Sequence, residues 1–495
     1  MLGVLDIGSN SGRVLVARLT GPNHLEVVAD ARSPLRLVRD VARDGRLTEE
    51  TVERTLGILR GFQAVSVAAG AEDTRAVATA AVREARNGQD FIDRVRSALA
   101  IPVEIADGDQ EARFGFLGAV HGLPVEHGIV LDVGGGSLQL THFRHRQLLR
   151  AWSLPLGALR LSDRFLRTDP PSRGEMRTLK QHVYERLQKA GVESLEPDER
   201  LIGTGGTVRN LAKVDRRAAS DYPISRLHAY VLERRAVDDV VGMLSTSVAQ
   251  ARARLPGLNA DRADSIVGGG LVVQAVMDRL LARDLTVAGY GLREGLLLAK
   301  FGEQPASIDA VRGAALDAFG SNFATWSAAQ AERRAQLVVR LLHGLDPRVS
   351  PEMRQVAACA ARLLDIGRSV DYYRRQVHAA RMVADANLDG YSHRMQALVA
   401  AVLLAAGERE ATVKAFAPLV TPADQAAIEQ VAATLVLTEA VTRYASAGLD
   451  DLWPERRDGT LHIDTQFLDT WPLEAPAKRA ERAFGVTIRV RSGGG

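Results

Sequence analysis

The sequence predicts two related α/β domains, followed by an all-helical region and a small α+β segment. Three observations support this fold class. First, Val4–Val16 (VLDIGSNSGRVLV) and Val130–His142 (VLDVGGGSLQLTH) share one order of apolar strand, aspartate, glycine, serine and second strand, about one domain's length apart. Second, helical and strand-like stretches alternate through the first three hundred or so residues. Third, from Gln304 onward Ala, Leu, Arg and Val recur at helical spacing, with few glycines.

The composition is ordinary for a globular chain of about three domains. The chain has 495 residues, of which 46% are hydrophobic and 25% are charged, and its formal net charge is only +3. This small net charge gives no reason to expect nucleic-acid binding. The single cysteine, Cys359, excludes an intrachain disulfide and a Cys-rich metal site. Because the sequence has neither a leader nor an apolar run of about twenty residues, we expect a cytoplasmic protein without a membrane span.

The first domain should begin with a three-stranded meander. Its strands are expected at 4–6, 13–19 and 25–31, with the second turn at Gly21-Pro22-Asn23. Helix and strand then alternate. The pattern predicts a helix from its N-cap Thr48 to Phe62, a strand at 76–81, a helix at 90–99 and a strand at 103–106.

A capping signal follows the last of these strands. Asp107 and Gln110 have the spacing of an N-cap residue and its reciprocal partner, which predicts a helix that runs toward His121. Glu111 then lies in the first turn of that helix. We therefore expect its carboxylate at a domain edge rather than in a core.

The second domain should start near Leu123 and repeat the plan. Strands are expected around Ile129, Leu138 and Leu148, in 201–202 and at 285–288. Helices are expected to begin at Arg160, Arg173 and Thr207. Two more should follow the Asp264–Gly270 turn and end at Lys300, respectively. The three glycine-rich turns that begin near Gly8, Gly134 and Gly203 resemble phosphate-binding corners, because free backbone N–H groups and helix N-termini attract anions. One such corner is equally consistent with an ordinary turn, but three in one pair of domains favour an anionic ligand held in a cleft.

The rest of the chain predicts a helical bundle and a small cap. Helices are expected at 307–319, 326–344, 351–366, 374–386, 393–406 and 422–446, the last with Thr421 as N-cap, followed by a strand at 460–464, a helix ending at Arg482 and a strand at 486–490. The terminal Ser492–Gly495 is expected to be disordered. The resulting domains are 1–122, 123–303, 304–447 and 448–495.

Six separated motifs resemble, in order and spacing, those of the exopolyphosphatase and guanosine pentaphosphate phosphatase (Ppx/GppA) family. They are DIGSNSGR (6–13), ATAAVREARNGQDF (78–91), DQEARFGFLG (109–118), LDVGGGS (131–137), IGTGGT (202–207) and GYGLREG (289–295). The resemblance covers about the first 300 residues. It implies two duplicated lobes of the sugar kinase, Hsp70 and actin superfold (ribonuclease H-like) around a cleft that hydrolyses the terminal phosphate of inorganic polyphosphate.

The resemblance also implies roles for individual residues. Glu111 matches the family's catalytic base and Asp132 a second catalytic residue, and Asp6, Glu111 and Asp132 are the expected ligands of Mg²⁺ or another divalent ion, with potassium as a further candidate ion. The phosphate-binding residues would be Asp6, Ser9, Asn10, Arg83, Gly134, Gly135, Gly136, Ser137, Gly205, Gly206, Thr207 and Arg293. Taken alone, Glu111 would be an ordinary solvated acid at a helix start, and each arginine a surface residue.

Two departures from the family pattern concern metal ligands. Gln139 stands where the family usually has a glutamate, so the site lacks one charge. The helical region resembles the HD-type domain of long exopolyphosphatases, but only Asp365 and His378 remain of its metal residues. We therefore interpret it as a retired metal centre kept as structure. Four arginines in this region (Arg362, Arg368, Arg374 and Arg375) line either a polyphosphate channel or a solvated basic face.

The sequence as a whole thus favours an exopolyphosphatase that releases orthophosphate. The alternatives are a guanosine pentaphosphate 5′-phosphohydrolase, a non-catalytic polyphosphate or nucleotide sensor and, less favoured, a sugar kinase. Inorganic polyphosphate is the expected partner, with guanosine pentaphosphate as second candidate and a homodimer as the expected assembly; nucleic acid and membranes are not expected.

Overall fold

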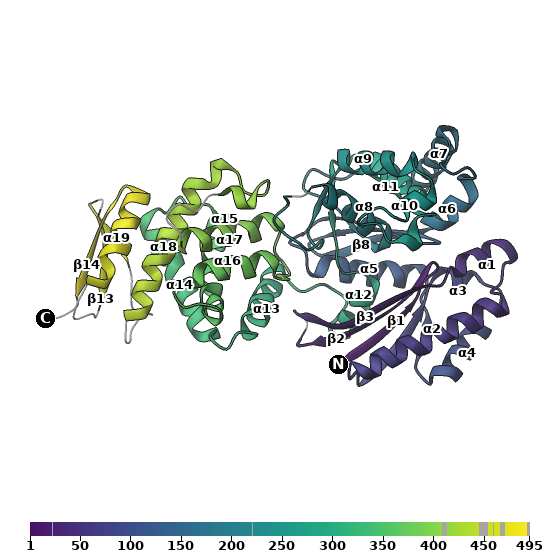
Figure 1. Ribbon diagram of the computed structural model, residues 1–495, viewed down its shortest axis with the longest axis horizontal. Coiled ribbons are helices and arrows are strands. Elements are labelled where there is room, and N and C mark those ends of the chain that lie inside the picture. The colour runs from purple at the N-terminus through teal and green to yellow at the C-terminus, as the bar shows by residue number, and fades with distance from the viewer. Residues whose placement is uncertain are drawn as a thin grey trace. The chain divides into compact units, whose positions relative to one another are not determined.

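The structure, a computed structural model, describes residues 1–21, 23–219, 221–407, 413–444, 454–458, 460–465 and 471–492. Two compact units make up the chain (Figure 1). Met1–Ser220 together with Leu227–Val311 form one, here called the α/β unit. Asp221–Arg226 together with Arg312–Gly495 form the other, here called the helical unit.

A five-stranded sheet organises the first lobe of the α/β unit. Its strands are β1 (Leu2–Ile7), β2 (Ser11–Leu19), β3 (Leu25–Pro34), β4 (Asp73–Ala78) and β5 (Val103–Ile105). They lie in the order β3-β2-β1-β4-β5, with an antiparallel meander on one side and parallel strands on the other. The predicted meander is confirmed, although Pro22 of its second turn lies outside the described residues.

The helices of the first lobe follow the predicted order with one addition and one correction. They are α1 (Leu37–Asp44), α2 (Glu49–Ala68), α3 (Ala80–Glu84), α4 (Gly88–Leu99) and α5 (Gly108–His121). The side chain of Thr48 caps α2 as predicted. The strand predicted at 76–81 is wrong at its end, because it stops at Ala78 and the alanines that follow begin α3. A short buried apolar run does not distinguish strand from helix, and alanine favours the helix.

The second lobe repeats this arrangement in a six-stranded sheet. Its strands are β6 (Gly128–Val133), β7 (Leu138–Arg144), β8 (Gln147–Leu154), β9 (Arg200–Thr204), β10 (Val231–Glu233) and β11 (Asp284–Val287), in the order β10-β11-β9-β6-β7-β8. The strands β6, β7 and β8 form an antiparallel meander, and β9 and β11 continue it in parallel. The duplicated α/β lobes predicted from the sequence are confirmed.

The helices of the second lobe are α6 (Ala158–Phe165), α7 (Arg173–Lys189), α8 (Gly205–Ala218), α9 (Arg234–Ser245), α10 (Ala249–Arg252), α11 (Ile266–Leu280) and α12 (Leu292–Leu298). Helix α8 begins at Gly205, two residues before the predicted start. The helices α5 and α12 pack against each other. The helix α5 contacts the second sheet, with Phe116 on Phe143, while α12 contacts β1 of the first sheet. The first turn of α12 packs against the middle of α5, where a Cβ at Gly295 would overlap the carbonyl oxygen of Phe114.

Ion pairs add further contacts between the lobes. Arg36 contacts Asp264 at 2.8 Å, and Arg39 contacts Asp264 at 2.9 Å and Asp163 at 3.2 Å. These side chains are partly exposed, so each pair stabilises the contact between the lobes by about 1 kcal/mol or less.

The helical unit contains the predicted bundle. Its helices are α13 (Ile308–Ser321), which starts in the α/β unit, α14 (Ala328–Leu345), α15 (Pro351–Leu363), α16 (Arg375–Asp385), α17 (His393–Gly407) and α18 (Gln425–Tyr444). Helix α18 starts later than predicted, because Pro422–Asp424 forms a 3₁₀ turn with Thr421 as its N-cap. Residues 445 and 446 of the predicted helix lie outside the described residues.

A three-stranded sheet and one helix close the chain as the predicted α+β cap. They are β12 (Glu455–Arg457), β13 (Thr460–Thr465), α19 (Trp471–Phe484) and β14 (Thr487–Ser492). The disorder predicted for Ser492–Gly495 is wrong at Ser492, which is the last residue of β14 and pairs with Thr465, and Gly493–Gly495 lie outside the described residues. In the part of the chain that the structure describes, none of the helices combines the length and the hydropathy needed to cross a bilayer.

Candidate active site

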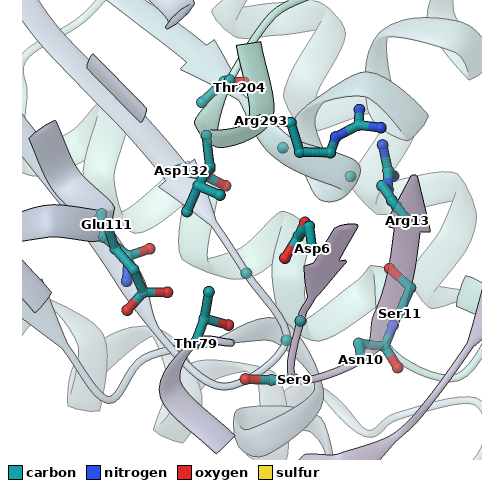
Figure 2. A pocket seen from close by; sticks show the side chains of 18 of the residues that line it. Asp6, Ser9, Asn10, Ser11, Arg13, Thr79, Glu111, Asp132, Thr204 and Arg293 are labelled. Carbon is teal, nitrogen blue, oxygen red and sulfur yellow. The ribbon is translucent and has the colours of Figure 1, made fainter. Parts of the chain in front are cut away.

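A polar cavity of about 130 Å³ opens where the glycine corners of both lobes meet the first turns of α5 and α12. Eleven of the predicted site residues line it: Asp6, Ser9, Asn10, Glu111, Asp132, Gly134, Gly135, Ser137, Gly205, Gly206 and Arg293. Figure 2 shows Asp6 near the centre of the view, with Glu111 and Asp132 on one side and Arg13 and Arg293 on the other. The cavity thus places carboxylates and guanidinium groups around one space.

Three predicted site residues lie behind this lining. Arg83 donates a hydrogen bond of 2.8 Å to the carboxylate of Glu111 and another to the carbonyl of Ala106. The hydroxyl of Thr207 donates to the carbonyl of Val133 at 3.1 Å, so it ties α8 to the end of β6. A Cβ at Gly136 would lie 3.1 Å from the hydroxyl of Ser9. Arg83 and Thr207 therefore support lining residues, and Gly136 allows the two corners to approach.

The two duplicated corners are in direct contact. A Cβ added to Gly135 would lie 2.7 Å from Cβ of Asn10, so only glycine fits without a shift at this point of the second corner. The hydroxyl of Ser9 accepts a hydrogen bond of 3.1 Å from the backbone N–H of Ala81 and so caps α3. The equivalent turns predicted from the sequence repeat thus meet across the lobe boundary.

Asp6 and Asp132 occupy equivalent positions in the two sheets. Each is the next-to-last residue of the first strand, and the register pairs Asp6 with Arg13 and Asp132 with Gln139. Gly205 has φ +80, and a Cβ there would overlap the carboxylate of Asp132. This glycine is therefore needed both for the backbone turn and for the space that the carboxylate fills.

Glu111 is positioned by the N-terminus of α5. Asp107 and Gln110 form the predicted capping box, which fixes the first turn of the helix. The Glu111 side chain is 8% exposed and its only ion pair within the described residues is with Arg83. Burial raises the pKa of Glu111 to about 7 despite the opposing effect of Arg83. Glu111 lies at the edge of the first lobe, as the sequence predicts, but its carboxylate is buried.

The two aspartates share this unusual electrostatic environment. Burial raises the pKa of Asp6 to about 6, against the opposing charges of Arg293 and Arg13. Burial also raises the pKa of Asp132. Raised carboxylate pKa values in a cleft are typical of catalytic and metal-binding groups.

Sequence reasoning missed three arginines that line the cavity. Burial and the charges of neighbouring arginines lower the pKa of Arg13 and of Arg209, and lower that of Arg262 to about 10. The buried Nε of Arg262 has no hydrogen-bond partner among the described residues. Mutually repelling, desolvated guanidinium groups around a cavity are stabilised by an anion. Arg13 could have been found from its register position opposite Asp6 and Arg209 from its place one turn after Gly205, whereas no sequence signal singles out Arg262.

The residues present fit a divalent metal ion held together with a phosphate ligand. Within the described residues, no three His, Cys, Asp or Glu side chains form a ready-made metal cage. Mg²⁺, however, is commonly bound through one or two carboxylates together with substrate phosphates and water. Asp6 and Asp132 provide two such carboxylates, and neither makes a side-chain hydrogen bond to another described residue.

Comparison with known proteins places this geometry in a family. The model of the Ppx/GppA phosphatase family matches residues 15–304, which include most of the cavity. The chain belongs to the Ppx/GppA phosphatase family. A second family model, that of Ppx/GppA phosphatase domain III, matches residues 311–475 in the helical unit. The Ppx/GppA resemblance derived from the sequence is thereby confirmed.

Individual Ppx/GppA relatives cover the two lobes. Exopolyphosphatase 1 of Mycobacterium leprae is 33% identical over 304 residues, which are 60% of this chain and 89% of the relative. Exopolyphosphatase 1 of Mycobacterium tuberculosis is 32% identical over 60% of this chain and 88% of the relative. Among solved structures, the Ppx/GppA family member of Aquifex aeolicus is 27% identical with a TM-score of 0.52, covering 60% of this chain and 96% of that one. An exopolyphosphatase from Cytophaga hutchinsonii is 25% identical with a TM-score of 0.55, covering 61% and 97%.

Proposed function

We propose that this Ppx/GppA phosphatase is an exopolyphosphatase that hydrolyses the terminal phosphoanhydride of inorganic polyphosphate. The observation that carries the proposal is the buried Glu111 carboxylate, whose pKa is about 7, in a cavity shared with four arginines and three further carboxylates, those of Asp6, Asp132 and Glu294. A base that accepts a proton near neutral pH and a set of fixed cations are the groups that phosphoryl transfer to water requires.

In this mechanism Glu111 orients a water molecule and takes its proton. The water oxygen forms a bond to the terminal phosphorus, the bond from that phosphorus to the bridging oxygen breaks, and orthophosphate and a chain shorter by one phosphate result. Arg83 positions the carboxylate of Glu111 by its 2.8 Å hydrogen bond. A divalent ion held by Asp6 and Asp132 would offset charge on the phosphate oxygens.

The remaining cavity groups hold the chain of phosphates. Arg13, Arg209, Arg262 and Arg293 supply positive charge to the cavity. Figure 2 shows Arg13 and Arg293 on the side away from Glu111. Backbone N–H groups of the glycine corners add neutral donors. The lining contains no aromatic side chain among the described residues, which favours an inorganic chain over a guanine nucleotide.

A phosphate-release assay with the purified full chain tests the proposal. We expect fast release from long-chain polyphosphate and slow release from guanosine pentaphosphate. The reverse preference would identify the guanosine pentaphosphate phosphohydrolase instead. Release from neither substrate would contradict a hydrolase and support the sensor, and phosphorylation of a sugar panel by ATP would indicate the kinase.

Gln139 provides a prediction about metal affinity. Its amide lines the cavity and donates a 2.8 Å hydrogen bond to the hydroxyl of Ser137, opposite Asp132 in the register. In Gln139→Glu the hydroxyl of Ser137 can donate a hydrogen bond to the new carboxylate. The added negative charge then lies beside the proposed ion. We expect the Mg²⁺ concentration for half-maximal turnover to fall by roughly tenfold, as for one added carboxylate ligand. An unchanged Mg²⁺ requirement would remove Gln139 from the metal site.

The raised pKa of Glu111 predicts the pH dependence of the reaction. Only the ionised carboxylate accepts a proton, so kcat/KM should be constant above about pH 7 and fall about tenfold per unit below it. A bound divalent ion favours the ionised form, so increasing Mg²⁺ should move the midpoint to lower pH. A profile between pH 5 and 9 at two Mg²⁺ concentrations measures both effects. At the lower Mg²⁺ concentration, a kcat/KM that stays constant down to pH 5, as expected for a glutamate with the ordinary pKa of 4.5, would contradict the assignment.

A further inference from the structure

The helical unit contains a second cavity, of about 420 Å³, between α14, the 3₁₀ segment Leu364–Ser369, the start of α16 and the end of α18. Its lining includes five arginines and two carboxylates: Arg333, Arg334, Arg368, Arg375 and Arg443 with Asp365 and Glu439. We call this cavity the arginine pocket. It lies where the sequence predicts a retired metal centre around Asp365.

Buried arginines form ion pairs with the two carboxylates of the arginine pocket. The carboxylate of Asp365 accepts a 2.7 Å hydrogen bond from Arg334, and both side chains are only 8% exposed. Glu439 is paired in the same way with Arg375, which also donates a 2.7 Å hydrogen bond to the carbonyl of Tyr372. A cation would have to approach these acids past guanidinium groups that already neutralise them. The pocket is therefore unsuited to a metal ion.

The other arginines leave the pocket with surplus positive charge. Arg333 is exposed and has no ion pair within the described residues. The side chain of Arg368 is 40% exposed and lies 3.7 Å from Asp365, a carboxylate that Arg334 already neutralises. Three guanidinium groups, those of Arg368, Arg375 and Arg443, surround the ring of Tyr372 at 4.9 to 5.8 Å from its centroid. Arg375 and Arg443 share the single carboxylate of Glu439, the latter at 2.7 Å, so five guanidinium groups in the pocket face two carboxylates. An anion with several charged oxygens would offset this surplus positive charge.

An aromatic surface adjoins this positive charge. Tyr372 is 43% exposed and Tyr373 is 87% exposed, with their rings perpendicular at a centroid distance of 5.4 Å. An exposed aromatic ring beside a basic pocket provides a face on which a planar base can stack. The catalytic cavity has no such group in its described lining.

We propose that the arginine pocket is a binding site for a nucleoside polyphosphate, separate from the catalytic cavity. Its phosphate groups contact Arg333 and Arg368, and its base stacks on Tyr373. The volume of the pocket lies within the range of small-molecule sites. This assignment does not depend on the chemistry proposed for the catalytic cavity, because the two sites share no residue.

Hydrogen exchange of the full chain locates the site. The probe is guanosine 5′-[β,γ-imido]triphosphate, in which nitrogen replaces the bridging oxygen and resists hydrolysis. We expect it to slow exchange in peptides from 328–345 and 364–376. Protection confined to the glycine corners near Asp6 and Asp132 would overturn the proposal, because the nucleotide would then occupy only the catalytic cavity.

Variants with measured Kd values test the two halves of the ligand. We expect the double variant Arg333→Ala and Arg368→Ala to weaken binding by at least thirtyfold, and Tyr373→Ala to weaken it by about tenfold. Both arginines and Tyr373 are exposed at least in part, so the fold is retained, which circular dichroism checks. Arg348→Ala is the matched control, because Arg348 is 89% exposed and pairs only with Asp346 among the described residues. Tripolyphosphate that binds as tightly as the nucleotide, with no effect of Tyr373→Ala, would overturn the assignment of a nucleoside.

Discussion

Glu111→Gln is expected to lower kcat for polyphosphate by about 10³-fold while leaving the Kd for polyphosphate within about threefold. Glutamine has nearly the same shape and can still contact Arg83, but its amide cannot take a proton from water. The arginines and glycine corners that hold the phosphates are unchanged in this variant. Single-turnover phosphate release measures the chemical step, and equilibrium binding of the chain measures affinity.

Asp109→Asn provides the control for Glu111→Gln. Asp109 lies in the same first turn of α5, but it is exposed and does not line the cavity. Both variants remove one negative charge near the N-terminus of α5, but only Glu111 lines the cavity, so the control should keep wild-type kcat. A similar loss in the two variants would show that the helix terminus, rather than a base at Glu111, governs the rate. Nearly normal turnover in Glu111→Gln would exclude Glu111 as the base.

Much of the catalytic cavity could be predicted because its residues lie in local motifs. The repeated order of aspartate, glycine and serine placed Asp6 and Asp132 at equivalent strand ends, and the capping pattern of Asp107 and Gln110 placed Glu111 in a first helical turn. Such signals depend on backbone geometry over a few residues. They are therefore readable from a single sequence.

Residues that reach the cavity through tertiary packing could not be predicted in this way. Arg262 belongs to a short 3₁₀ segment, Ala260–Arg262, and its guanidinium fills the space beside Gly206. Nothing near Arg262 in the sequence indicates that contact. In the same way, α5 follows the strands of the first lobe in the chain but packs on the sheet of the second, so chain order alone does not reveal its location.

Local structure was missed where the usual signals are weak. Helix α1 was not predicted, since its N-cap is Arg36, which has a positive φ and makes no side-chain capping bond. The sequence also predicted that the helical unit keeps the remnant of a metal centre at Asp365 and His378. The structure shows that Arg334 pairs with Asp365 instead, and this ion pair joins residues about thirty positions apart.

The second large effect concerns Asp6, where stability and activity should change in opposite directions. Its pKa is raised from 3.8 to about 6, so the folded state holds the proton more tightly than the unfolded state does. The stabilisation that comes with protonation is complete below pH 3.8 and is lost as the pH rises through 6. At pH 7 the ionised group therefore destabilises the fold by up to about 3 kcal/mol, taking 1.36 kcal/mol per pKa unit.

Asp6→Asn mimics the protonated carboxyl group and should recover much of that free energy. In metal-free buffer at pH 7 we expect a higher Tm than in the wild type, together with a loss of phosphate release of at least about a hundredfold, because a proposed ligand of the divalent ion is removed. Mg²⁺ should raise the Tm of the wild type and leave that of Asp6→Asn nearly unchanged, since an ion stabilises only a fold that binds it. Asp30→Asn on the exposed side of β3 is the matched control and should change neither property. A lower Tm for Asp6→Asn, or a wild-type response to Mg²⁺, would mean that the buried charge of Asp6 is balanced by the arginines alone and is not held for a metal ion.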